Sequence, residues 1–345
     1  MSKSNKPHPT IKHVAKKANV STATVSLVLS NNERISNETK AKVLEIIKEL
    51  DYFPSRSARD LVSKKTGNIG FILTHEHFLT TEPFYTQIFL GTEFEARENE
   101  FYVLLTTISS DFQPGESLPR FIRERSVDGI IVAGKVPDTF LTEIEKYELP
   151  TVFVDYFPAK RDFPVIMIDN ENGGRLATEH LVRAGHRKIA FIGGDFEHPS
   201  IGDRLEGYRR ELRKNKIAVN EKLIFLSEKS PVKETGYEGV KFLMESGADF
   251  TAIFACNDAV AIGVIQYLKE HSIRIPEEVA VIGFDDVESG LLIDPPLSTV
   301  KVPKLEMGIE AMQLIADSLK NKSKLSKKIL VPVELIVRQS TEKKV

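Results

Sequence analysis

Side chains able to bind and orient a small molecule recur where apolar runs of the sequence end. Asp155, Tyr156, Asn257 and Asp285 closely follow such runs, and Arg204 starts a helical stretch after another. Carboxylate, amide and guanidinium groups form paired hydrogen bonds with hydroxyls, and an aromatic face can stack on a sugar ring. Together these residue types suit a small polyhydroxylated ligand.

Each of these polar residues also has a structural interpretation. A polar side chain just after a strand commonly caps the helix that follows. For any one of them, the sequence supports capping as well as it supports ligand contact. We interpret their neighbours Asp258 and Asp286 as structural.

The runs that precede these residues are rich in Val and Ile. Such continuous runs are typical of parallel strands that are buried on both faces of a sheet. They alternate with amphipathic stretches, which predicts a doubly wound α/β core with enough βα units for two sheets. A ligand is expected in the crevice at the carboxyl ends of the strands. The runs are Ile69–Leu73, Tyr102–Leu105, Gly129–Val132, Thr151–Val154, Val165–Ile168, Ile189–Ile192, Ala252–Ala255 and Val279–Ile282.

The N-terminal part of the chain carries a charge opposite to that of the rest. Residues 1–66 contain 13 Lys and Arg against 6 Asp and Glu, a net charge of +7, and the remainder has −9. No acidic residue precedes Glu33. A basic segment joined to an acidic body is typical of a module that binds a polyanion such as DNA.

Three short helices are predicted in this basic part. Thr10 can cap the first, and Ser21 can cap a second over Thr22–Leu29. Ser36 can cap a third, which Pro54 prevents from continuing. Two helices about three residues apart form a helix-turn-helix, whose second helix reads DNA.

The second helix presents short side chains to solvent. Its Val25, Val28 and Leu29 face inward. Small hydroxyl and methyl groups near its start let backbone N–H groups approach a phosphate. The outward residues are Thr22, Ala23, Ser26 and Leu27.

Six segments closely resemble the lactose-repressor (LacI/GalR) family of bacterial transcription regulators. In the basic part they are residues 10–26 (TIKHVAKKANVSTATVS), 35–40 (ISNETK) and 50–61 (LDYFPSRSARDL). Further on they are residues 195–208 (DFEHPSIGDRLEGY), 255–263 (ACNDAVAIG) and 275–287 (IPEEVAVIGFDDV). The resemblance implies a three-helix DNA-binding head, a hinge helix and a two-lobed core like that of periplasmic binding proteins.

The resemblance also implies which residues contact DNA. The base-reading positions fall on Thr22, Ala23 and Leu27. The phosphate-contacting positions fall on Thr24, Ser26, Ser30 and Thr39. Ala58 and Leu61 match the hinge-helix pair that enters the minor groove.

Effector contacts are carried over to the core in the same way. Arg204, Asn257 and Asp285 match polar contacts of the family, and Asp155 matches a further one. The segment with Phe84 and Tyr85 resembles the aromatic edge of the crevice, although both residues are equally compatible with the core. With Tyr156, the expected effector set is Phe84, Tyr85, Asp155, Tyr156, Arg204, Asn257 and Asp285.

Two residues depart from the family pattern. Leu27 stands where the family often has Arg, so it can offer apolar contact, for example to a thymine methyl, but no bidentate pair with guanine. His13 stands where the family usually has Asp, and we interpret it as a neutral variation. Leu27 therefore leaves the operator sequence open.

These patterns predict three domains. The DNA-binding domain is expected over residues 1–53, the hinge helix and linker over 54–67, and the core over 68–345. Within the core, the N-lobe is expected to comprise about 68–163 and 295–323, and the C-lobe about 164–294 and 324–340.

The predicted function is sequence-specific transcription regulation, as a repressor whose operator affinity a sugar controls. The expected partners are approximately palindromic double-stranded operator DNA, a carbohydrate effector and a second copy of the chain, in a homodimer or tetramer. A nucleobase co-repressor or a protein co-regulator is the alternative controlling partner.

Other protein classes lack their signatures in this sequence. No apolar stretch approaches the roughly 18 residues that a membrane span needs, and no signal peptide is apparent, so a cytoplasmic protein is expected rather than a secreted solute-binding one. Glycine motifs for nucleotide phosphates and recognisable catalytic sets are missing, so no enzyme activity is expected. Cys256 is the single cysteine, so no internal disulfide is expected, and no Cys/His cluster has zinc-ligand spacing, so no metal is expected. No cofactor is expected either.

Overall fold

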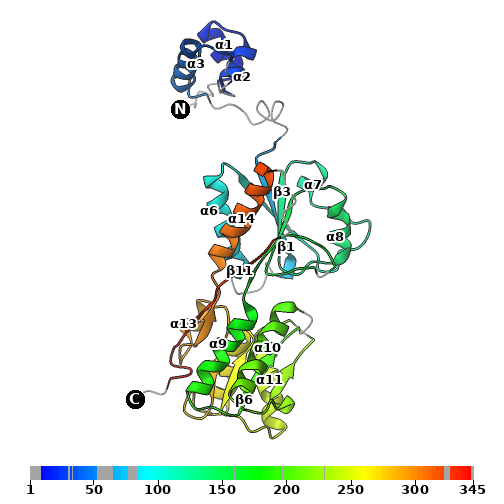
Figure 1. Ribbon diagram of the computed structural model, residues 1–345, viewed down its shortest axis with the longest axis vertical. Helices are drawn as coiled ribbons and strands as arrows, with labels where there is room; N and C mark the ends of the chain where they lie inside the picture. Colours follow the sequence, from blue (N-terminus) through cyan, green and yellow to red (C-terminus); the bar gives the residue numbers. More distant parts are fainter. Residues whose placement is uncertain are drawn as a thin grey trace, which may run out of the picture. The chain divides into compact units, whose positions relative to one another are not determined.

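The structure is a computed structural model that describes residues 9–29, 32, 34–52, 65–76, 84–158, 160–195, 198–228, 230–321 and 327–342. The chain divides into two units, Met1–Thr66 and Gly67–Val345, and each is described by itself (Figure 1). Ser30 of the head and the expected hinge residues Ala58 and Leu61 lie outside the described residues.

The first unit consists of three helices around a small apolar core. They are α1 (Ile11–Ala18), α2 (Thr22–Leu29) and α3 (Asn37–Glu49). Val14, Val25 and Val43 contribute one fully buried side chain from each helix. The helix-turn-helix head predicted from the apolar spacing is confirmed.

Two of the predicted helix caps are formed by serine hydroxyls. Ser21 Oγ accepts the N–H of Thr24 at 3.0 Å, and Ser36 Oγ accepts the N–H of Thr39 at 3.3 Å. At α1, His13 Nδ1 accepts the backbone N–H of Thr10 at 3.0 Å. In a capping box, the side chain at this position accepts the N–H of the N-cap residue. His13 accepts the N–H of Thr10 in the same way, in place of an acidic residue.

The second unit contains two parallel sheets. The six-stranded sheet of the first lobe has the order β11-β5-β4-β3-β1-β2, and the four-stranded sheet of the second lobe has the order β7-β6-β8-β9. The strands of the first sheet are β1 (Asn68–Thr74), β2 (Tyr102–Ile108), β3 (Gly129–Ala133), β4 (Thr151–Val154), β5 (Val165–Ile168) and β11 (Lys328–Val331). Those of the second are β6 (Ile189–Gly193), β7 (Ile224–Leu226), β8 (Ala252–Ala255) and β9 (Ala280–Ile282).

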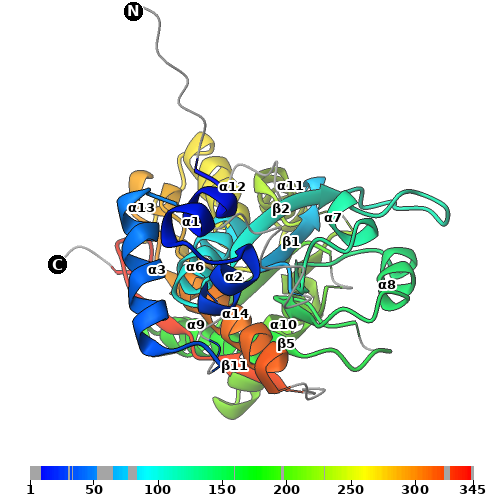
Figure 2. The same ribbon diagram turned by 90° about the horizontal axis from the view of Figure 1, so that it is seen from above.

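Helices cover both faces of the first sheet. They are α6 (Phe84–Glu98), α7 (Arg120–Arg123), α8 (Asp138–Glu145) and α14 (Lys304–Asn321). Along β1, Ile69 and Phe71 enter the core shared with α6 and α14, whereas Ile72 enters the core shared with α7 and α8. Figure 2 shows α6 and the α7–α8 pair on opposite sides of β1 and β2. Burial on both faces explains the continuous apolar runs.

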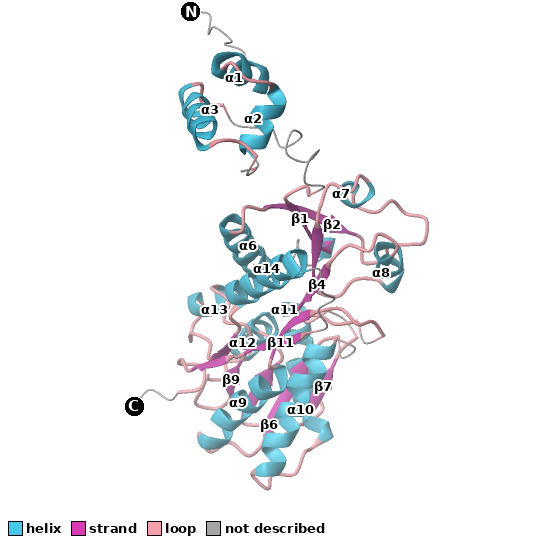
Figure 3. Ribbon diagram, turned by 45° about the horizontal axis from the view of Figure 1, so that its top comes forward, coloured by secondary structure: helices cyan, strands magenta, loops and turns pink. Residues whose placement is uncertain are grey.

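The second lobe is built in the same way, as Figure 3 shows with its strands among helices. Its helices are α9 (Asn170–Arg183), α10 (Pro199–Lys214), α11 (Lys233–Glu245), α12 (Asp258–Glu270) and α13 (Ser289–Leu292), with a 3-10 turn, η1, at Glu221–Leu223. A short antiparallel pair joins β10 (Thr299–Lys301) and β12 (Glu334–Ile336). The doubly wound α/β core is confirmed. None of the described helices is long and apolar enough to cross a membrane.

The lobe boundaries differ from those expected. The expected second lobe includes residues 164–168 and 324–331, but β5 pairs with β4 and β11 in the first sheet. The expected first lobe includes residues 295–301, but Ser298 and Lys301 bridge to Ile282 and Asp285 of the second lobe. The first crossover between the lobes therefore follows Ile168, and β11 joins the first sheet before the chain returns at β12. An apolar run identifies a strand, whereas the sheet that the strand joins depends on partners far away in the sequence.

Candidate functional site

Arg204 on α10 lies at the centre of a buried polar cluster. Its side chain is 7% exposed, and its guanidinium stacks over the ring of Phe284, 3.7 Å from the centroid. Nε donates to Asn170 Oδ1 at 2.8 Å, and Nη1 donates to the carbonyl of Cys256 at 2.6 Å. Nη2 lies 3.6 Å from Asp285 Oδ1. These contacts fix the guanidinium in one orientation.

Close helix packing places Arg204 in this position. A Cβ on Gly174 of α9 would lie 2.2 Å from the backbone oxygen of Arg204. Any larger residue at 174 would therefore push α10 away from α9, and Gly permits the approach.

Asp155 follows β4 of the first lobe and faces the same cluster. Its backbone has φ +62°, and its Oδ2 accepts a hydrogen bond from Tyr85 Oη at 3.0 Å. Oδ1 is buried and has no hydrogen-bond partner among the described residues. Burial raises the pKa of Asp155 to about 6, against the opposing effects of Arg204 and the Tyr85 hydroxyl. Burial, assisted by the Asp155 charge, raises the pKa of Tyr85 well above its usual value, so Tyr85 stays protonated and donates.

Asp285 stands in a strained loop after β9. Asp285 and Asp286 have φ values of +112° and +54°, which non-glycine residues rarely adopt. Lys304 Nζ donates to the Asp285 carbonyl, and Arg338 Nη2 donates to Asp286 Oδ1 at 2.6 Å. The loop is thus held from two other parts of the chain.

Asp258 holds this loop from a third side. Its Oδ2 accepts the N–H of Val287 at 2.9 Å, and its Oδ1 accepts the hydroxyl of Thr299 at 2.6 Å. Burial, with the nearby Asp285 charge, raises the pKa of Asp258 well above its ordinary value. Asp258 and Asp286 are structural, as interpreted from the sequence, although they support the Asp285 loop rather than cap a helix.

Asn257 takes the capping role that the sequence left open. Its Oδ1 accepts the N–H of Val260 at 2.8 Å, which caps α12, and its Nδ2 donates to the Pro231 carbonyl at 2.8 Å. Both ends of the carboxamide are therefore engaged within the second lobe. Effector contact by Asn257 stays a prediction and would use its remaining hydrogen-bonding capacity.

The other two expected aromatic contacts, Phe84 and Tyr156, lie at different places. Phe84 packs edge-on against Tyr85 with ring centroids 5.0 Å apart, and Lys304 Nζ lies 5.7 Å from its centroid. The half-buried Tyr156 lies in the first lobe, and its ring centroid is 6.0 Å from that of His198 in the second. The structure thus brings Tyr85, Asp155, Arg204 and Asp285 together, with Phe84 and Tyr156 flanking them.

Sequence reasoning missed three groups near Arg204. Ser200 precedes it by one helical turn, and its Oγ is buried without a hydrogen-bond partner among the described residues. His198 is the N-cap residue of α10, and burial, with Arg204 adding to it, lowers its pKa to about 4. Lys135 of the first lobe pairs with Asp195 of the second at 3.2 Å. In the sequence, the helix start at Pro199-Ser200 was only a weak indication that Ser200 lies in the site. Nothing in the sequence indicated that Lys135 pairs with Asp195.

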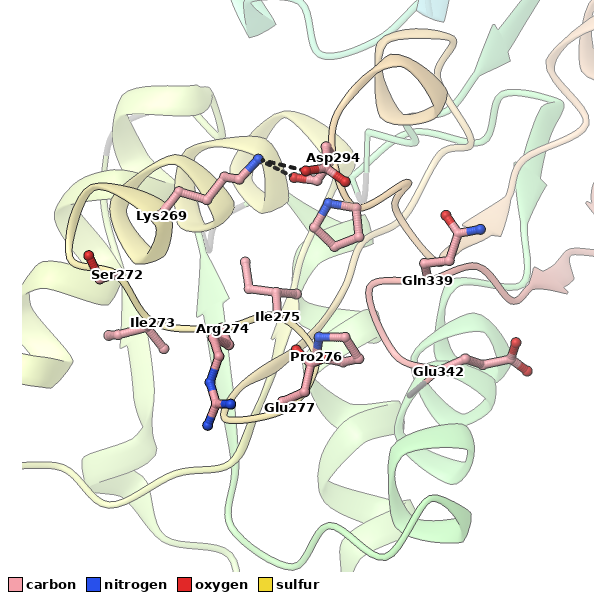
Figure 4. Close-up of a pocket in the computed structure, with 11 residues that line it drawn as sticks. Lys269, Ser272, Ile273, Arg274, Ile275, Pro276, Glu277, Asp294, Gln339 and Glu342 are labelled. Atoms are coloured by element: carbon pink, nitrogen blue, oxygen red, sulfur yellow. Dashed lines mark hydrogen bonds and ion pairs between the residues drawn. The ribbon is translucent and has the colours of Figure 1, made fainter. Parts of the chain in front are cut away.

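A separate pocket of about 360 Å³ lies elsewhere in the second lobe (Figure 4). Its lining includes Ile275 and Pro276, which precede β9, whereas Asp285 follows β9. The pocket therefore lies at the amino ends of the strands, opposite to the Arg204 cluster. None of the predicted effector residues, all of which the structure describes, lines it. Its rim carries both charges: Lys269, Arg274, Glu277, Asp294 and Glu342.

The residues of α2 that are predicted to contact DNA are at least partly exposed where the structure describes them. Thr22 and Ala23 are exposed, and Thr24, Ser26 and Leu27 are partly exposed. Val25 and Val28 are buried, as predicted from their spacing. Thr39 lies at the start of α3, where its Oγ1 accepts the Ser36 hydroxyl at 2.9 Å. No acidic residue lies in the first turn of α1 or α2, so the positive ends of both helices keep their attraction for phosphate.

Comparison with known proteins gives consistent matches over both units. Residues 10–55 match the family described as "Bacterial regulatory proteins, lacI family", and residues 178–341 match "Periplasmic binding protein-like domain". The ribose operon repressor of Haemophilus influenzae is 32% identical over 332 residues, which covers 96% of this chain and 98% of the relative.

Two solved structures are similar over almost the whole chain. A complex of the transcriptional regulator CelR with cellobiose has a TM-score of 0.72 at 28% identity, covering 96% of this chain and 99% of the other. A lac repressor dimer bound to operator and the anti-inducer ONPF has a TM-score of 0.77 at 25% identity, covering 97% and 99%.

Proposed function

Because the chain belongs to the lacI family of bacterial regulatory proteins, and is a DNA-binding transcriptional regulator, we propose that a sugar bound beside Arg204 controls its operator affinity. The family and the fold expected from the sequence are confirmed. The α2 surface reads the operator, and the cluster between the two lobes receives the effector.

Two buried oxygen atoms carry this proposal. Asp155 Oδ1 and Ser200 Oγ lack hydrogen-bond partners among the described residues, and both belong to the surroundings of Arg204. A buried polar atom left unsatisfied costs about 1–3 kcal/mol, so such atoms are expected where a ligand completes their bonding. A sugar hydroxyl can donate to Asp155, and a second can pair with Ser200 while Arg204 donates to a third oxygen.

The names of similar proteins support a carbohydrate. One relative is a ribose operon repressor, and one similar structure holds cellobiose. These proteins are regulators, which supports regulation rather than catalysis for this chain.

A ligand screen tests the proposal. A sugar that binds only the native protein is expected to raise its melting temperature, and calorimetry then gives its affinity. Asp155→Asn and Ser200→Ala should each weaken binding of that sugar. Gln339→Ala, in the pocket at the opposite strand ends, is the matched control and should leave affinity unchanged. If a nucleobase raises the melting temperature and no sugar does, the effector of this site is a nucleobase and the sugar proposal is wrong.

Effector affinity is expected to fall as the pH drops below about 6. The folded-state pKa of Asp155 is raised from 3.8 to about 6, so the carboxyl takes up a proton in this range. A proton on Asp155 competes with the sugar hydroxyl, and affinity should fall by up to about tenfold per pH unit. His198, with its pKa lowered to about 4, stays neutral between pH 5 and 7. Calorimetry at pH 5, 6 and 7 measures this, and an affinity independent of pH would contradict the role of Asp155.

Leu27→Arg is expected to change the operator preference. Leu27 is partly exposed on α2, and an arginine there can pair with guanine, adding about 1–3 kcal/mol of discrimination at one half-site position. Lys12 is exposed on α1, and Lys12→Ala should weaken binding to all sequences alike. Selection from random DNA by each variant gives the preferred motifs. Identical motifs for the wild type and Leu27→Arg would remove Leu27 from the base-reading surface.

A homodimer is the proposed DNA-binding form. A similar structure is a lac repressor dimer bound to operator, which supports this form. Exposed apolar side chains that adjoin one another on the core are the kind of surface that such an interface covers. They include Leu291 and Leu292 of α13, which are 51% and 81% exposed, and Tyr102 of the edge strand β2 at 63%.

A further inference from the structure

One ion pair joins the two lobes beside the proposed effector site. Lys135 follows β3 of the first lobe, and Asp195 follows β6 of the second. Lys135 Nζ lies 3.2 Å from Asp195 Oδ2, within hydrogen-bond reach. Because these residues belong to different sheets, their distance depends on how the lobes are arranged.

An aromatic contact between the same two lobes lies next to this ion pair. Tyr156 follows β4, the strand paired with β3, and its ring lies 6.0 Å from that of His198, three residues after Asp195. The charges of Lys135 and Asp195 act on His198, and the charge of Lys135 acts on Tyr156, which places all four side chains together. His198 is neutral at pH 7 because its pKa is lowered to about 4. The ion pair is therefore the charged part of the contact.

We propose that Lys135 and Asp195 form a clasp that sets the balance between closed and open arrangements of the lobes. This inference rests on the proposed function, since it concerns how effector binding between the lobes is regulated. The clasp holds the lobes in the arrangement in which Asp155 of the first lobe and Arg204 of the second surround one site. It acts on the arrangement of the lobes and needs no contact with the effector.

The exposure of the clasp suits a reversible switch. The two side chains are 39% and 29% exposed, and ion pairs in such settings change an equilibrium only about two- to fivefold. A stronger clasp would keep the lobes closed whether or not effector is present. A weak one leaves an equilibrium that a ligand with different affinities for the two arrangements can shift.

Charge reversal in the full-length protein tests the clasp without any ligand. Spin labels are attached at Lys146→Cys in the first lobe and Arg213→Cys in the second, whose native side chains are both 60% exposed. The native Cys256 is buried and should not react. Pulsed electron–electron double resonance then gives the distribution of distances between the lobes.

Lys135→Asp and Asp195→Lys are each expected to lower the closed-to-open ratio about three- to thirtyfold, since each removes an attraction and adds a repulsion. The double variant, with the charges exchanged, should restore the ratio to within about twofold of wild type. As the matched control, the same reversal at Lys188 and Asp249, an ion pair within the second lobe, should leave the distances unchanged.

Unchanged distances in both single variants would overturn the clasp, as would a double variant that stays as open as the singles. Such a result would leave the proposed function intact, because operator binding and the ligand screen are measured independently. If the wild-type protein binds no operator and responds to no ligand, but the variants show the expected distance changes, the proposed function is rejected and the clasp is kept.

Discussion

A core that begins at Gly67 is expected to lose specific operator binding, by about a thousandfold or more relative to the full-length protein. The α2 surface and the +7 charge of residues 1–66 leave with the head, and the remaining chain carries −9, which repels DNA. The core forms its own compact unit with both sheets, so the loss should not arise from unfolding. Circular dichroism and sugar binding of the truncated protein provide the control.

The salt dependence of the full-length protein gives a second measure of the same surface. Each phosphate contact releases counterions, so the logarithm of operator affinity should fall linearly with the logarithm of salt concentration, with a slope of about −0.9 per contact. Gel retardation or fluorescence anisotropy over a range of salt concentrations measures it. A truncated core that binds operator as tightly as the full chain would contradict the assignment of DNA binding to the head.

Replacement of Arg204 by Ala is expected to abolish the effector response and to lower the stability of the core. The change removes the bonds to Asn170 and Cys256 and leaves the Asp285 carboxylate without the guanidinium that lies 3.6 Å away. Breaking a buried charge pair from one side costs about 3–5 kcal/mol, and loss of the effector contact should weaken sugar binding by about a hundredfold or more.

Two further variants separate binding from folding. Arg204→Lys keeps the charge but cannot make the forked set of bonds, so it should fold better than Arg204→Ala and still lose most effector affinity. Arg210→Ala is the matched control on the same helix, because the Arg210 side chain is 62% exposed and pairs with Glu206 and Glu171 on the surface. Arg210→Ala should change the free energy of unfolding by no more than about 0.5 kcal/mol. Unaltered sugar affinity in Arg204→Lys would remove Arg204 from the effector site.

The features that local sequence determines were predictable. Ser21 and Ser36 cap helices within three residues of themselves, and the stripes that include Val14, Val25 and Val43 are set by helical spacing. The strands were equally predictable, because both faces of each sheet are buried and the strands therefore appear as continuous apolar runs. Local pattern therefore gave the head and the fold class.

The features that depend on distant partners were not predictable. The lobe to which β5 and β11 belong follows from their mutual pairing, across more than 150 residues of chain. Ser200 is one hydroxyl among many in the sequence, and only burial without a partner distinguishes it. The role of the Asp195 carboxylate depends on its ion pair with Lys135, which is 60 residues away in the sequence. Asn257 shows the reverse case, where a residue carried over as an effector contact also caps a helix.

The effect of the sugar on operator affinity, compared between wild type and Asp155→Asn, tests the central claim most directly. Fluorescence anisotropy gives the operator Kd of each full-length protein with and without the sugar found in the screen. The expected result is a sugar-dependent change of about 5- to 150-fold in wild type and a greatly reduced change in Asp155→Asn, with equal operator affinity of both proteins without sugar. An undiminished change in Asp155→Asn would contradict control of the DNA-binding head from the Arg204 cluster.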